Sequence, residues 1–452
     1  MSRRKVNERL SALLTEAGWN GGQLARAVNA LGSAQGWRFR YDRTSVAHWV
    51  AGSRPRPPVP ELVAGAFTRQ LRRLVTPVDT GLAQRGGSPD PLAVQPEGEA
   101  AVPGLIALCR EDVDTVRRVP LARAVFTPVA PATLSASPVS APAVAVGRHR
   151  ATAADVSVLE EMTRVFAGVN QQHGGGSARF ALATYIAEHT GELLSAAAAD
   201  QVRQDLLTMA SRLAYILAEM TADMHQMGLA QRYFHLALRL AQESQNRGQS
   251  AITLRAMSSL ALRAGHVRHA VELADAAADL VAAKTADATV DAAVQSFVLT
   301  QRSLAHARDG MRHRALADLR RAEQLHARSE EHPDPFSAYS RASFDYQRAG
   351  THAALGHRAE CRRALTSSLR HRTPGEHRPL ALTHSRIAEE LIRRGELEEA
   401  CANWLAFLEH CGYVRSAAVQ QALGGLHQHL RPHARQPRAA EVLARARDFT
   451  VT

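Results

Sequence analysis

Residues 44–55 read Thr44-Ser45-Val46-Ala47-His48-Trp49-Val50-Ala51-Gly52-Ser53-Arg54-Pro55. Small polar residues open this stretch and favour the start of a helix, whereas the glycine before a proline-containing turn favours its end. Residues 45–50 contain neither glycine nor proline, and Gly52 follows them. The stretch therefore predicts a short helix.

Three further short helices are predicted around it, over residues 5–17, 23–31 and 59–74, from the helical spacing of their apolar residues. Either Asp42 or Thr44 is a suitable cap for the helix that contains Trp49. Four short helices with a basic surface are typical of a helix-turn-helix module.

The positive charge of the chain is concentrated in this N-terminal segment. The 452-residue chain carries a formal net charge of +12, and residues 1–75 account for +9 of it through thirteen basic and four acidic side chains. The rest of the chain is nearly balanced. A basic head on a nearly neutral body favours an anionic partner, and double-stranded DNA is the expected one.

The quoted stretch resembles the recognition-helix signature of the lambda-repressor-like (Xre-type) helix-turn-helix family. The resemblance implies that Val46 and Trp49 are buried and that the helix lies in the major groove. The side chains on its solvent side, which are expected to read the groove, are Arg43, Thr44, Ser45, Ala47 and His48. Those expected to contact backbone phosphates are Gln23, Arg54 and Arg56.

The connection before this helix is longer than the tight turn of simple repressors. Residues 32–41 alternate the aromatic residues Trp37, Phe39 and Tyr41 with Arg38 and Arg40. Two interpretations stay open. The connection is either a short wing whose Arg38 and Arg40 grip the DNA backbone, or a packed loop whose arginines face water.

Composition and length predict an all-α protein of two or three domains. Hydrophobic residues make up 45% of the chain but aromatic residues only 5%, and alanine and leucine predominate. We expect a helix-turn-helix DNA-binding domain over residues 1–76 and a Pro/Ala-rich linker over 77–150, with short helices between Leu105 and Val125. The linker is expected to act as a hinge to a helical body over residues 151–452.

An internal repeat marks the body. Five glycines are each followed five residues later by an alanine, cysteine or tyrosine and preceded seven residues earlier by a small residue: Gly228, Gly265, Gly310, Gly356 and Gly395. This pattern resembles the tetratricopeptide repeat (TPR), although the glycines are 37, 45, 46 and 39 residues apart rather than about 34. We therefore expect a TPR-like α-solenoid, with residues 414–452 as its cap.

The concave face of such a solenoid is a candidate ligand groove. On the TPR register the residues facing it are Tyr215, His225, Arg255, Arg263, Thr300, Arg308, Tyr346 and Arg393. Their arginines and tyrosines suit a peptide carboxylate or another anion on a peptide, small-molecule or protein partner. Alternatively, the arginines form salt bridges with acidic residues of neighbouring repeats.

Other motifs carry no chemistry that we can identify. Residues 173–179 contain three glycines but lack the end of a phosphate loop, so a flexible joint is expected there. Some histidines lie at plausible metal-ligand spacing, but no matching cysteines or clustered carboxylates accompany them, the four cysteines show no CxxC spacing, and no catalytic motif is present. We expect no enzyme activity, no metal, no cofactor and no membrane segment, in a cytoplasmic, nucleoid-associated protein.

Over nearly its whole length the chain resembles the actinobacterial regulators that join an Xre-type head to a TPR-like body, including the Nsd-type negative regulators of differentiation and antibiotic production. The stretches that carry the resemblance are residues 45–55, 72–82, 173–179 and 228–234. It implies a transcriptional regulator, expected to be a repressor, that acts as a homodimer on DNA. The alternative is a TPR-type interaction scaffold or signalling protein without operator binding.

Overall fold

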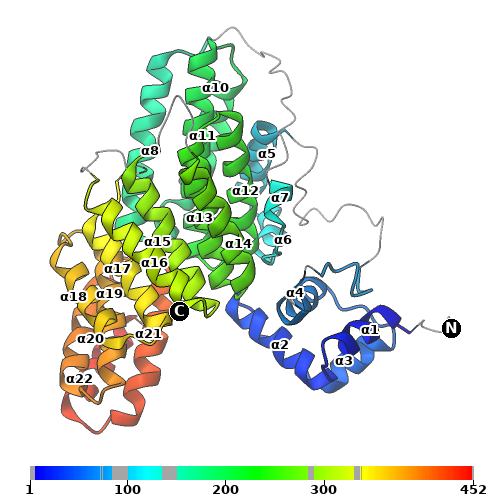
Figure 1. Cartoon of the computed structure of the whole chain (residues 1–452), viewed down its shortest axis with the longest axis vertical. Helices are drawn as coiled ribbons and strands as arrows, with labels where there is room; N and C mark the ends of the chain where they lie inside the picture. Colours follow the sequence, from blue (N-terminus) through cyan, green and yellow to red (C-terminus); the bar gives the residue numbers. More distant parts are fainter. Residues whose placement is uncertain are drawn as a thin grey trace.

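The computed structural model describes residues 6–71, 73, 75–83, 100–134, 150–283, 290–329, 336 and 338–449. Within these ranges the regular elements are all helices, so the predicted all-α class is confirmed. Figure 1 shows a small helical head, formed by the N-terminal residues, beside a larger helical body. No helix among the described residues is long and apolar enough to cross a bilayer.

The head contains the four predicted helices, with bounds close to those expected. They are α1 (Glu8–Glu16), α2 (Gly21–Ala34), α3 (Arg43–Val50) and α4 (Val59–Leu71). Asn20 starts α2 earlier than predicted because it forms a capping box with Gln23, in which each side chain accepts a backbone N–H of the other residue. Residues 72 and 74, within the predicted fourth helix, lie outside the described ranges.

The described residues of the predicted linker pack against the head or the body. Its short helices are present as α5 (Ala101–Val113), α6 (Arg118–Ala122) and α7 (Pro131–Leu134). Ala101, Leu105 and Cys109 on α5 are fully buried in the core of the body. The apolar residues of α5 lie at helical spacing and pack into this core. The sequence analysis did not predict this packing, because the proline-rich sequence on either side indicated a linker. Of the hinge region predicted over residues 77–150, residues 84–99 and 135–149 lie outside the described ranges.

The body begins with α8 (Ala153–His173), α9 (Arg179–Tyr185) and α10 (Gly191–Ser195) and continues as an array of antiparallel helix pairs. The pairs are α11 (Asp200–Asp223) with α12 (Met227–Glu243), α13 (Arg247–Arg263) with α14 (Val267–Ala282), α15 (Ala292–Arg308) with α16 (Arg312–His326), α17 (Arg341–Ala354) with α18 (Arg358–Arg370), and α19 (His377–Ile392) with α20 (Leu397–Cys411). The helices α21 (Ala417–Leu430) and α22 (Pro437–Ala446) cover the last pair. The predicted helical repeat array is therefore confirmed.

The register predicted for the first pair is wrong by three residues. Its turn residue is His225, with φ of 60°, where the later pairs have Gly265, Gly310, Gly356 and Gly395 with φ between 75° and 85°. Gly228 instead lies inside α12, where a Cβ atom would come within 2.4 Å of the Ala124 backbone. The glycine is needed for this close approach and not for a turn.

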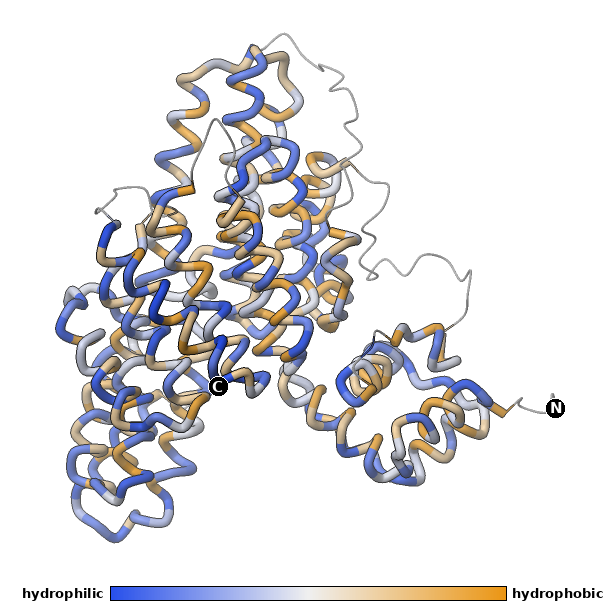
Figure 2. Tube along the Cα trace, in the orientation of Figure 1, coloured by the Kyte–Doolittle hydropathy of each residue, from blue (hydrophilic) through white to orange (hydrophobic). Residues whose placement is uncertain are grey.

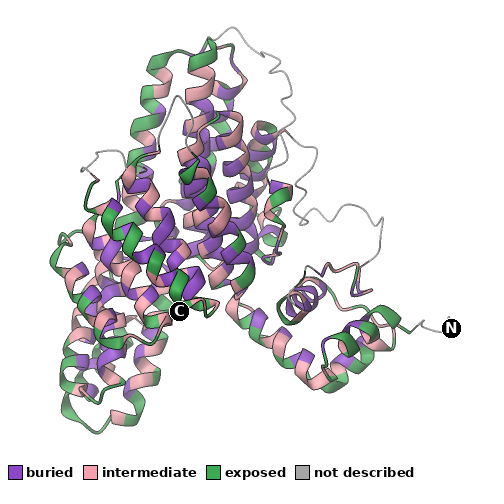
Figure 3. Cartoon of the chain, in the orientation of Figure 1, coloured by how far each residue is buried: buried purple, intermediate pink, exposed green. Residues whose placement is uncertain are grey.

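Polar and apolar residues mix along every helix of the body, as expected of helices that bury one face (Figure 2). Buried residues are densest in α11–α14, whereas much of α8 and of α21–α22 is exposed (Figure 3). The helix α8 lies on the concave side of the array, because it contacts both α11 and α19. The array is therefore partly closed on its inner side.

Candidate functional site

Asp42, rather than Thr44, caps the N-terminus of α3. Its Oδ1 atom accepts hydrogen bonds from the backbone N–H and from the hydroxyl of Ser45, both at 2.8 Å. The backbone bond is the main reason that the pKa of Asp42 is lowered. Ser45 is half-buried and engaged in the cap, whereas Arg43, Thr44, Ala47 and His48 are exposed on the side of α3 predicted to face DNA.

The opposite side of α3 anchors it in the head. Val46 and Trp49 are buried, 1% and 5% exposed, in a core shared with Leu24 of α2 and Phe67 of α4. These two residues therefore pack inward as predicted, and they fix which side chains of α3 face solvent.

The loop between α2 and α3 is packed through its aromatic residues. Trp37 stacks on Phe39, Phe39 on Tyr41, and Tyr41 meets Trp49 edge-on, with ring centroids 5.5, 5.3 and 5.2 Å apart. Asn29 holds the backbone of Tyr41 by donating to its carbonyl at 2.8 Å and accepting its N–H at 3.0 Å. Arg38 and Arg40 are exposed on the alternate positions. The packed-loop interpretation thus describes the aromatic residues, and DNA contact by the two arginines stays a prediction.

Six exposed arginines on α2 and around α3 have no ion pair or side-chain hydrogen bond with any described residue. They are Arg26, Arg38, Arg40, Arg43, Arg54 and Arg56, of which Arg26 was not singled out from the sequence. In the body, by contrast, arginines such as Arg302 and Arg378 pair with Asp318 and Asp223 at 2.5 and 2.8 Å. Gln23 is engaged in the cap of α2, where its side-chain oxygen Oε1 accepts the Asn20 N–H at 2.8 Å. The charge of the head is therefore largely uncompensated around α3.

The segment after α4 completes the head. Asn7 donates to the carbonyl of Thr80 at 2.9 Å, and Val75 and Leu82 are buried in the same core as Leu10. The head thus extends structurally to about residue 83, beyond the predicted boundary at residue 76.

The body brings together part of the predicted ligand groove. Tyr215 lies on α11, where burial raises the pKa of its hydroxyl and the charges of Arg255 and Arg263 oppose that shift. Thr300 is fully buried on α15, where its hydroxyl donates to the Ser296 carbonyl at 2.7 Å. Tyr346 on α17 lies under the guanidinium of Arg386, 4.7 Å from its ring centroid.

The other predicted groove residues lie at helix ends. His225 is in the α11–α12 turn, and Arg308 is the exposed last residue of α15. Arg393 pairs with Glu389 and Glu390 at 3.4 and 2.5 Å. For this arginine the structure shows salt bridges, the alternative to ligand binding, although both partners lie on its own helix. No ion pair with a described residue is found for Arg255, Arg263 or Arg308.

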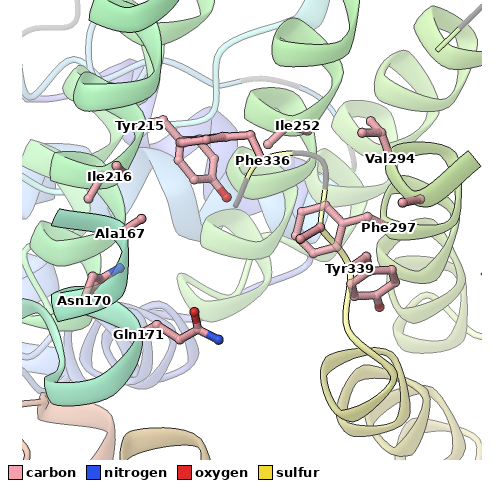
Figure 4. Close-up of a pocket in the computed structure, with 12 residues that line it drawn as sticks. Ala167, Asn170, Gln171, Tyr215, Ile216, Ile252, Val294, Phe297, Phe336 and Tyr339 are labelled. Atoms are coloured by element: carbon pink, nitrogen blue, oxygen red, sulfur yellow. The ribbon is translucent and has the colours of Figure 1, made fainter. Parts of the chain in front are cut away.

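A cavity of about 150 Å³ lies on the inner side of the array, between α8, α11, α13, α15 and the segment before α17 (Figure 4). Apart from Tyr215, its aromatic lining residues were missed by the sequence reasoning. These residues are Phe297, Phe336 and Tyr339. Aromatic residues are rare in this chain, and their clustering near the first helices of successive pairs was the signal that could have found them.

The glycines of residues 173–179 form a close-packed joint and not a flexible one. A Cβ atom on Gly175 would come within 2.2 Å of the Met220 carbonyl oxygen, and one on Gly174 within 2.8 Å of the Arg415 carbonyl oxygen. The N–H of Gly175 donates to Asp223 at 2.9 Å. These glycines let the end of α8 pass directly against α11 and the segment before α21.

The head contacts the body through the end of α2 and through α4. The side-chain carbonyl of Gln35 accepts the backbone N–H of Phe126 at 2.8 Å, and Gly65 on α4 lies against the ring of His266. Arg69 lies against Gly265, which precedes His266 in the α13–α14 turn. The other end of α2 lies beside α3, so α3 stays clear of this contact.

Residues 10–83 match the family model described as the SP15 N-terminal domain. The matched segment runs from α1 to the turn after α4, which is the segment whose apolar residues form the core of the head. A comparison with curated proteins finds no match for the chain. The family match therefore concerns the head.

Proposed function

We propose that the protein is a sequence-specific DNA-binding transcriptional regulator whose head reads the major groove with α3. The observation that carries the proposal is the set of six unpaired arginines around an exposed helix whose other face is buried. Exposed arginines without acidic partners suit phosphate contacts and bidentate recognition of guanine. Arg43 and His48 are the groove readers in this proposal, and Arg38, Arg40, Arg54 and Arg56 contact the backbone.

The body serves in this proposal as the dimerisation and sensing part. The resemblance to actinobacterial Xre-type regulators with TPR-like bodies supports a homodimeric repressor of development or secondary metabolism. A ligand or partner of the body would change the placement of the two heads, so that their recognition helices no longer fit half-sites about 34 Å apart. The contact of Gln35 with Phe126 supplies a physical route from the body to α2.

Selection of bound duplexes from a random pool by the full-length protein tests the proposal. We expect one enriched, inverted-repeat motif, and a mobility shift that Arg43→Ala and His48→Ala weaken at least tenfold. Arg320→Ala, which removes an exposed arginine of α16, is the matched control and should bind as the wild type does. Recovery of no motif would favour the interaction scaffold without operator binding.

A further inference from the structure

The inner side of the array has room for a small molecule and not for a long chain. The end of α8 is held there by bonds to the far end of the array: the Arg415 N–H donates to the His173 carbonyl at 2.8 Å, and Gln171 donates to Glu376 at 3.5 Å. Because α8 occupies the concave side, an extended peptide cannot follow the first helices along their whole length.

The cavity has the size and lining of an aromatic site. Its volume of about 150 Å³ is close to that of an engineered protein cavity that binds one benzene molecule. Ile216, Ile252 and Val294 are buried in its walls. Two aromatic pairs also line it: Tyr215 with Phe336, and Phe297 with Tyr339, at centroid distances of 5.6 and 4.9 Å.

Positive charge surrounds these rings. The guanidinium of Arg212 lies 4.9 Å from the Phe336 centroid, and that of Arg255 lies 3.9 Å from the Phe297 centroid. Arg263 is accessible to water and has no ion pair with a described residue. Glu219 faces Tyr215 and Arg263, and Asp223 is already paired with Arg378. Among the described residues near Tyr215 that are not paired elsewhere, the two arginines Arg255 and Arg263 outnumber the one carboxylate, Glu219.

A polar group is also present on the wall that α8 contributes to the cavity. Asn170 and Gln171 of α8 project towards the cavity (Figure 4). The side-chain carbonyl oxygen of Asn170 is buried and has no hydrogen-bond donor among the described residues. A ligand hydroxyl that donates to this oxygen would remove the cost of leaving it unpaired.

We propose that this cavity binds a small organic anion with one aromatic ring, such as a hydroxybenzoate. The ring lies among Tyr215, Phe297 and Phe336, and the carboxylate lies at the end marked by Arg255 and Arg263. The hydroxyl donates to Asn170. This inference names the effector of the regulator and so rests, for its biological meaning, on the proposed function.

The position of Arg263 connects this site to the head. Arg263 is the last residue of α13, two residues before Gly265, which lies against Arg69 and Leu31 of the head. His225, whose pKa is lowered by burial and by Arg263, lies beside Gly36 at the end of α2. An anion that draws in the Arg263 side chain therefore acts next to the docking surface of the head.

Calorimetric titration of the full-length protein with 4-hydroxybenzoate tests the site. We expect saturable one-site binding, at least tenfold weaker binding of the uncharged 4-hydroxybenzyl alcohol, and a similar loss with Arg263→Gln. Arg320→Gln removes an exposed arginine far along the chain and should leave binding unchanged. Val294→Phe should abolish binding by filling the cavity, and the milder Val294→Leu gives a graded loss if the larger residue prevents folding.

Absence of binding for benzoate, 4-hydroxybenzoate and 4-hydroxyphenylacetate at millimolar concentration would overturn the proposal. Equal binding by wild type, Arg263→Gln and Val294→Leu would overturn it as well. The DNA shift is measured separately on the same samples. A lost ligand site with an intact DNA shift rejects the effector inference alone, whereas ligand binding without a DNA shift rejects the proposed function alone.

Discussion

The side-chain carbonyl oxygen of Gln35 accepts a hydrogen bond from the backbone N–H of Phe126 at 2.8 Å, across 91 positions of the sequence. Gln35 follows α2 of the head, and Phe126 belongs to the segment that packs on the body. Both residues are buried, so this bond joins the two parts of the chain where water cannot replace it.

Gln35→Leu should loosen the contact between head and body. The substitution leaves the Phe126 N–H buried without an acceptor, which costs about 1–3 kcal/mol. Hydrogen exchange should then rise at residues 31–36 and 124–128 while α13–α16 keep their protection. Ser33→Ala changes an exposed side chain of α2 and is the control. Unchanged exchange in Gln35→Leu would show that the bond does not hold the head.

Acidification should destabilise the protein through two buried histidines. Burial, with His269 as a second cause, lowers the pKa of both His235 and His266 to about 3; Arg69 adds to the effect on His266. His266 also contacts Phe126 and Gly65 at the docking surface. Below pH 6.5 the unfolded chain takes up protons that the folded chain does not, so stability falls as the pH drops.

Each of these histidines should contribute roughly 2 kcal/mol of lost stability between pH 6.5 and pH 5. Urea denaturation across this range measures the loss, and His266→Gln should flatten the curve by about that amount. The exposed His313→Gln controls for removal of a histidine. A curve of the same slope in His266→Gln would contradict the assignment.

Arg179→Met should destabilise the body strongly. Arg179 pairs with Asp112 at 2.5 Å and donates to Thr221 at 3.0 Å, and the hydroxyl of Tyr233 also donates to Asp112 at 2.7 Å. Removing the arginine leaves a buried carboxylate without its counter-charge, at a cost of about 3–5 kcal/mol. Tyr233→Phe removes one bond and should cost about 1–2 kcal/mol.

Arg118→Met is the matched control for Arg179→Met in chemical denaturation. Arg118 lies 5.2 Å from the same Phe180 ring that Arg179 contacts at 4.8 Å, but no described acidic residue pairs with it. Similar losses in the two variants would mean that ring contact, and not the ion pair, stabilises this region.

Gly32→Ala should destabilise the head although alanine favours a helix. A Cβ atom on Gly32 would lie 2.7 Å from the Phe39 ring, which is fixed between Trp37 and Tyr41. We expect a net loss of about 1–3 kcal/mol from this overpacking. Gly22→Ala, in the same helix, meets nothing closer than 3.4 Å and should be neutral or stabilising. Thermal unfolding of the two variants, compared with the wild type, measures the difference in stability.

Arg40→Ala should weaken binding to the selected DNA without changing the preferred sequence. A phosphate contact contributes about one unit to the slope of log affinity against log salt, so the slope should decrease by about 1. Arg43→Ala should instead relax the preference at one base pair. An unchanged salt slope in Arg40→Ala would favour a packed loop whose arginines only face water.

Local sequence determined much of the head. The helical spacing of the apolar residues, the cap at Asp42 and the surplus of arginines act within a few residues of the chain, so the helices and their basic surface could be predicted. The repeat of small residues and glycines predicted the paired helices of the body for the same reason. In the first pair, where His225 replaces the turn glycine, the pattern placed the register on Gly228 instead.

Tertiary structure alone decided which distant segments meet. The burial of α5, the position of α8 on the inner side of the array and the bond from Phe126 to Gln35 depend on packing between residues far apart in the chain. The cavity is likewise lined by α8, α11, α13, α15 and the segment before α17. Helical periodicity reports which face of a helix is buried but not which partner covers it, and for this reason the interior site appeared only in the folded chain.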